Sequence, residues 1–115
     1  MENIAVNRGD VWFADLPINN NYVLYGKHPV LVIQNYKGLL HSPTVIVAGI
    51  TSKLKKQNLP THVPLDVPFL DISSQVLTET ILTLDRSKLK QKMGRIPPEV
   101  QKKIDYALAV SIGLK

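Results

Sequence analysis

The chain has 115 residues, of which 44% are hydrophobic and 20% charged, a composition typical of one globular domain rather than a disordered or membrane protein. No apolar run approaches the roughly 20 residues that a membrane-spanning helix needs. The N-terminal residues lack an export-signal pattern, so we expect a single cytoplasmic domain over residues 1–115. The absence of cysteine excludes disulfides, thiolate metal sites and a cysteine nucleophile.

The charge balance is basic, with 14 Lys and Arg against 9 Asp and Glu and a net charge of +5. This excess favours a polyanionic partner, although many proteins without such a partner are equally basic. The three histidines, His28, His41 and His62, have no metal-binding spacing, so we expect no metal. The common phosphate-loop, serine-hydrolase and zinc-protease motifs are missing as well.

The first predicted element is a strand over residues 11–16, because aromatic and β-favouring residues follow a turn-type start. A polar surface loop over residues 17–26 comes next. Residues 29–34 and 44–50 are short apolar runs rich in β-branched side chains. We interpret both as central strands buried on both faces, with turn residues at 35–38 between them.

Residues 61–65 continue the β pattern, and Pro64 predicts an edge strand or a strand end because it cannot donate a ladder hydrogen bond. Residues 75–78 and 80–84 supply further strands. After Pro98 the apolar residues are spaced three and four positions apart, which predicts a helix from about Pro98 to Ile112.

These elements predict a mainly β fold, a small barrel or curled antiparallel sheet with a C-terminal α-helix, rather than a βαβ fold. The predicted core consists of Val11, Phe13, Val30, Val32, Val45, Val47, Leu77, Ile104 and Leu108.

Several sequence blocks resemble, in order, the PemK/MazF family of toxin–antitoxin ribonucleases. They begin with RGDVWFADLP at residues 8–17, HPVLVIQN at 28–35 and TVIVAGITSK at 44–53. They continue with LPTHV at 59–63, TLDRSKL at 83–89 and ALAVSIGL at 107–114. Each block alone is weakly specific, but the ordered set covers nearly the whole chain.

The resemblance implies an SH3-like barrel that forms a homodimer and cleaves single-stranded RNA at short sequences without a metal or cofactor. The products are expected to be a 2′,3′-cyclic phosphate and a 5′-hydroxyl. A cognate acidic antitoxin protein is the implied partner. Two alternatives stay open: a degenerate member that binds RNA or antitoxin without cleaving, and, with less support, a gyrase-poisoning toxin on the same fold.

The family's catalytic pair is an Arg before the Pro of the second strand and a Thr at the end of the third. Thr51 matches the Thr, whereas His28 stands at the Arg position. An imidazole can exchange protons near neutral pH but lacks the permanent charge of an Arg. From the residues alone, His28 could equally be a half-exposed strand-start residue, and Thr51 a strand terminator bonded to nearby backbone.

The resemblance and the charge pattern also give candidate RNA-binding residues, namely Tyr22, Tyr25, Lys27, Ser52, Lys53, Lys55, Lys56 and Thr80. The tyrosines either stack on unpaired bases or fold back over the barrel. The lysines after Thr51 either follow the phosphates or form a solvated face that protects a sheet edge. The same choice applies to Lys88, Lys90 and Lys92, which share one face if that segment is extended. Family members carry Gln and Arg where this chain has Thr80 and Leu82.

Overall fold

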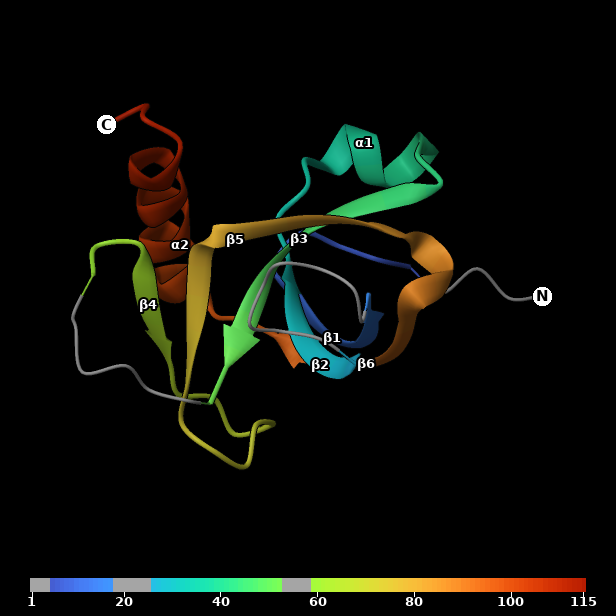
Figure 1. The fold of residues 1–115 in the computed structure, drawn as a ribbon, viewed down its shortest axis with the longest axis horizontal. Coiled ribbons are helices and arrows are strands. Elements are labelled where there is room, and N and C mark those ends of the chain that lie inside the picture. Colours follow the sequence, from blue (N-terminus) through green and yellow to red (C-terminus); the bar gives the residue numbers. More distant parts are fainter. Residues whose placement is uncertain (1–4, 18–25, 53–58) are drawn as a thin grey trace.

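The computed structural model describes residues 5–17, 26–52 and 59–115, in which six strands form one curled sheet (Figure 1). The strands are β1 (Asp10–Leu16), β2 (Gly26–Val32), β3 (Thr44–Thr51), β4 (His62–Leu65), β5 (Ser74–Asp85) and β6 (Leu89–Arg95). Their order is β4-β5-β3-β2-β1-β6, and all neighbours are antiparallel. The helices are α1 (Tyr36–His41), α2 (Pro98–Ser111) and the 3-10 turn η1 (Arg86–Lys88). The predicted curled sheet with a C-terminal helix is confirmed.

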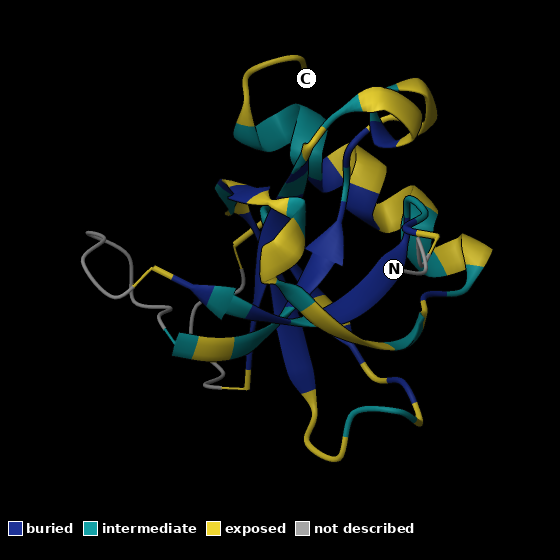
Figure 2. Ribbon diagram, turned by 90° about the vertical axis from the view of Figure 1, so that its right-hand side faces the viewer, coloured by how far each residue is buried: buried dark blue, intermediate teal, exposed yellow. Residues whose placement is uncertain are grey.

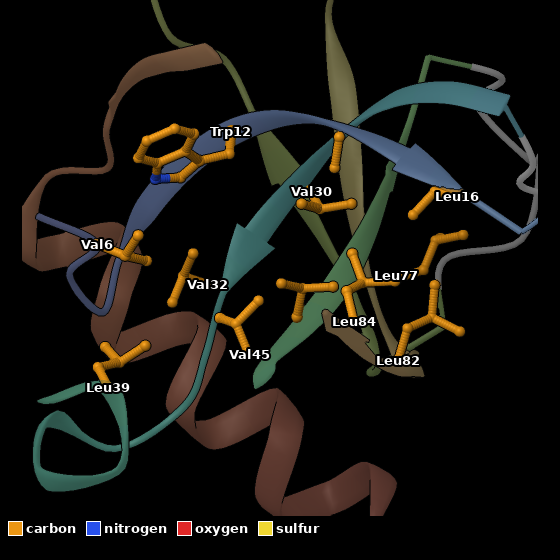
Figure 3. Close-up of a cluster of buried hydrophobic side chains, with 12 residues drawn as sticks. Val6, Trp12, Leu16, Val30, Val32, Leu39, Val45, Leu77, Leu82 and Leu84 are labelled. Atoms are coloured by element: carbon orange, nitrogen blue, oxygen red, sulfur yellow. The ribbon is translucent and has the colours of Figure 1, made fainter. Parts of the chain in front are cut away.

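Apolar side chains fill two cores, one on each face of the sheet, because successive residues of a strand point to opposite faces. Val30 and Val32 of β2 belong to the first core, and Leu31 between them belongs to the second. Figure 3 shows the first core, and Figure 2 shows that buried residues follow the strands. Helix α2 covers the second core with Ile104 and Ala107. The expectation that the central strands are buried on both faces is therefore confirmed.

Most of the predicted core residues are buried, but Phe13 and Leu108 are only half-buried. Phe13 lines a cavity of about 340 Å³ with Phe69 and Met93, and no residue of α2 lines that cavity. The helix therefore leaves this part of the second face less covered. Leu108 still packs against the second core, from the last turns of α2.

Local structure differs from the sequence-based expectation at two places. Residues 35–38, predicted as a turn, begin α1, because the Asn35 side chain accepts a hydrogen bond from the Gly38 N–H at 2.8 Å. The two strands predicted around Glu79 are one strand, β5, with an irregularity opposite Gly49 that leaves residues 78–80 out of the ladder. The prediction that Pro64 marks an edge strand is confirmed by β4.

No helix in the described part of the chain is both long and apolar enough to cross a membrane.

Candidate active site

His28 is the third residue of β2 and is half-buried. It shares the alternation of Val30 and Val32, so its side chain points to the face of the sheet that carries the first core. Its Nδ1 atom is buried and has no hydrogen-bond partner among the described residues. The β1 residue opposite it is Ala14, which has a small side chain.

Thr51 is the last residue of β3 and is only 6% exposed. It alternates with Val45 and Val47, which places its side chain on the same face as that of His28. Its partner in the β3–β5 ladder is Gln75, which is 8% exposed. Thr51 and Gln75 therefore lie side by side at the end of their strands.

The register of the sheet directs His28 and Thr51 to the same end of one face. The β2–β3 ladder pairs Val30 with Gly49, and continuing that register by two residues brings His28 opposite Thr51. The hydrogen-bonded ladder stops at Val30, so the two strands open toward this end. The start of β2 and the end of β3 both lie at the lower end of the sheet in Figure 1. The result is a row across three strands, made of His28, Thr51 and Gln75, which we call the open end.

Two of the polar atoms in this row lack partners. His28 Nδ1 and Gln75 Oε1 are both buried without a hydrogen bond within the described residues. Buried polar atoms are hydrogen-bonded in the great majority of cases, so such atoms on both sides of Thr51 indicate a site for a polar ligand. The sequence analysis missed Gln75, although a Gln beside the apolar pair Val76 and Leu77 of a strand was a usable signal.

The described RNA-binding candidates take different positions around the open end. Ser52 is exposed and directly follows β3. Lys27 is exposed, but alternation points it to the opposite face from His28, where Asp15 is its cross-strand partner. Thr80 belongs to the irregular segment of β5 and is not the ladder partner of Thr51. Tyr22, Tyr25, Lys53, Lys55 and Lys56 lie outside the described residues, and their roles stay predictions.

Lys90 and Lys92 each lie close to an aspartate, which favours the interpretation of these lysines as a solvated sheet edge. Lys92 Nζ lies 3.5 Å from the buried carboxylate of Asp10, and Lys90 Nζ lies 4.0 Å from Asp15. Both lysines belong to the edge strand β6. Hydrogen bonds from the backbone N–H and side chain of Ser87 lower the pKa of Asp85, and Lys88 adds a smaller effect.

Comparison with known proteins identifies the family. The family model described as "PemK-like, MazF-like toxin of type II toxin-antitoxin system" matches residues 7–112. Endoribonuclease EndoA of Bacillus subtilis (strain 168) is 43% identical over 113 residues, which cover 96% of this chain and 97% of that protein.

Solved structures agree with this assignment. A mycobacterial endoribonuclease in complex with its cognate antitoxin is 28% identical, with a TM-score of 0.80 over 96% of this chain and 98% of that chain. MazF from Deinococcus radiodurans is 20% identical and matches in fold, with a TM-score of 0.82 over 96% of this chain and 99% of that chain. The chain therefore belongs to the PemK/MazF-like toxin family of type II toxin–antitoxin systems, whose relatives include endoribonucleases.

Proposed function

We propose that the protein is a metal-independent endoribonuclease toxin that cleaves single-stranded RNA at short sequences, with the open end as its active site. Family membership and the 43% identical endoribonuclease support the activity. The observation that carries the assignment of the site is the register, which directs His28 and Thr51 to one face at one end of the sheet.

The proposed reaction needs no cofactor. The ribose 2′-oxygen attacks the adjacent phosphorus while the bond from phosphorus to the 5′-oxygen breaks, which gives a 2′,3′-cyclic phosphate and a 5′-hydroxyl. His28 takes the 2′-proton through Nε2, because Nδ1 is buried. Thr51 donates a hydrogen bond to a phosphoryl oxygen as charge develops there, and solvent supplies the proton to the leaving 5′-oxygen.

The proposed partners are an acidic cognate antitoxin and a second copy of the chain, in the cytoplasm. The net charge of +5 favours binding of an acidic segment, and one mycobacterial relative was solved with its antitoxin. Tyr106, Ile112 and Leu114 are exposed near the end of α2 and offer apolar area for the dimer. A monomer in sedimentation at micromolar concentration would contradict the dimer, and antitoxin binding that is insensitive to salt would contradict the electrostatic account.

The alternative is a family member that binds RNA or antitoxin without cleaving. Two observations favour it: His28 replaces the Arg of the resemblance, and Leu82, at another Arg position, is buried in the first core. The chain therefore lacks two of the permanent positive charges that the family pattern provides. A protein that binds RNA tightly but leaves it uncut would establish this alternative.

The test is incubation of the purified protein with a long single-stranded RNA in EDTA, followed by mapping of the new ends. We expect cleavage with cyclic-phosphate and 5′-hydroxyl ends. Thr51→Val should slow it by roughly 10²-fold, as expected when a donor to a developing oxyanion is lost. Thr83→Val is the matched control on the exposed side of β5 and should cleave normally. Cleavage that stops in EDTA would contradict the proposed mechanism.

A further inference from the structure

Gln75 is a polar residue that takes no part in the proposed reaction. Its side chain is more than nine-tenths buried, and its Oε1 atom has no hydrogen-bond partner within the described residues. The ladder pairs it directly with Thr51, and alternation with Leu77 points it toward the face of the first core. A buried carbonyl oxygen without a partner costs free energy, so its retention beside Thr51 points to a ligand that satisfies it.

The chemistry of Oε1 limits what that ligand can be. An amide oxygen only accepts hydrogen bonds, and the oxygens of a phosphodiester do the same, so the scissile phosphate cannot satisfy it. The nearest donors that any RNA supplies beside a phosphate are its ribose 2′-hydroxyls, which also distinguish RNA from DNA.

The order of residues across the sheet selects one ribose. Gln75 lies on one side of Thr51 at one strand spacing, roughly 4.8 Å, and His28 lies on the other side, where β2 and β3 open apart. A phosphate above Thr51 therefore has one ribose toward His28 and the other toward Gln75. Because His28 takes the proton of the attacking 2′-hydroxyl, Gln75 faces the ribose on the leaving-group side.

We propose that Gln75 is a further substrate-contacting residue, whose Oε1 accepts a hydrogen bond from the 2′-hydroxyl of the nucleotide that follows the scissile phosphate. The inference rests on the proposed function and deepens it. Through this contact the site requires ribose at the position of the chemistry and prefers ribose at the next position, where the contact serves recognition. A substrate with a single ribonucleotide in a DNA strand is consequently a poorer substrate than RNA.

The test compares two RNAs that differ only in a 2′-deoxy substitution at the nucleotide after the cleaved bond. The unmodified protein should cleave the substituted RNA about 3- to 10-fold more slowly, the effect of one neutral hydrogen bond. Gln75→Met keeps the length of the side chain but loses the acceptor, so it should cleave both RNAs at equal rates. Gln75→Glu keeps an acceptor and should retain the deoxy penalty while cleaving more slowly overall, because its carboxylate repels the phosphate.

The ratio of the two rates is measured on one protein preparation, so incomplete folding of a variant does not change it. Gln91→Met, at an exposed position of β6, is the control and should keep the full ratio. An unchanged ratio in Gln75→Met would overturn the inference. A change only in the base that the protein prefers at the cleavage site would also overturn it, because it would show that Gln75 contacts a nucleobase. If the unmodified protein cut neither RNA, the proposed function itself would be wrong.

Discussion

Two regions of β5, its start and the irregular segment in its middle, use polar side chains differently. At the open end, His28 and Gln75 each bury an atom without a partner on either side of Thr51. At the irregular segment of β5, polar groups bond one another in what we call the bulge cluster. Its members are Thr61, His62, Thr78, Glu79 and Ser111.

The bulge cluster connects three elements. Thr78 Oγ1 donates to the Thr61 carbonyl oxygen at 2.6 Å, and Ser111 of α2 donates to the Thr78 carbonyl oxygen at 3.1 Å. His62 Nε2 lies 2.8 Å from Glu79 Oε2, while its Nδ1 atom, like that of His28, is buried without a hydrogen-bond partner among the described residues. Hydrogen bonds of the bulge cluster thus connect β5 to the start of β4 and to α2, whereas the open end is the proposed substrate site. Each region should therefore respond to substitution in a different assay.

The largest expected effect is on catalysis, at His28. His28→Ala should slow RNA cleavage by roughly 10²- to 10⁴-fold, the usual contribution of a general acid or base. Binding of a cleavage-resistant RNA analogue should stay largely intact, because the family fold and the other contacts are unchanged. Initial cleavage rates and a binding titration measure the two quantities. Cleavage by His28→Ala as fast as by the unmodified protein at every pH would leave His28 as a strand-start residue only.

The intermediate effect is on stability, at the bulge cluster. Thr78→Val keeps the shape of a fully buried side chain but removes its hydrogen bond to Thr61. We expect the unfolding free energy to fall by about 0.5–1.5 kcal/mol, the net contribution of one hydrogen bond, because the Thr61 carbonyl oxygen still accepts from the Thr78 N–H. Denaturant unfolding measures this loss, and the cleavage rate per folded molecule should hardly change. A large loss of activity without loss of stability would remove the distinction between the two regions.

The smallest effect concerns Asp85, which is paired but exposed at the far end of β5. The hydrogen bonds from Ser87 lower the pKa of Asp85 below its ordinary value of 3.8. A lowered pKa in the folded state means that the carboxylate stabilises the fold above the unfolded value, and that this contribution disappears as pH falls through the folded value. Asp85→Asn should therefore be slightly less stable at neutral pH, and the difference should vanish in strong acid. Thermal unfolding at several pH values measures it.

The sequence predicted the architecture well, because apolar runs such as residues 44–50 and the Pro98 helix start are local signals. It could not predict that β5 is continuous through Glu79, because the irregularity is stabilised by partners on β4 and α2 that are distant in sequence. Phe13 was expected in the core because alternation alone does not show how far a helix covers a sheet. Gln75 was missed for the same reason, since its importance depends on being the ladder partner of Thr51.

The most direct test of the central claim is the pH–rate profile of cleavage in EDTA for the unmodified protein and His28→Arg. If His28 takes the 2′-proton, the unmodified protein should lose activity toward acid pH, which gives an acid limb in the profile, because a protonated imidazole cannot accept a proton. His28→Arg should flatten that limb, because guanidinium stays protonated throughout. A higher rate in His28→Arg with a flat profile would mark His28 as a weakened substitute for the family's Arg. Identical limbs in both proteins would contradict the claim that His28 is the proton-transfer residue of this site.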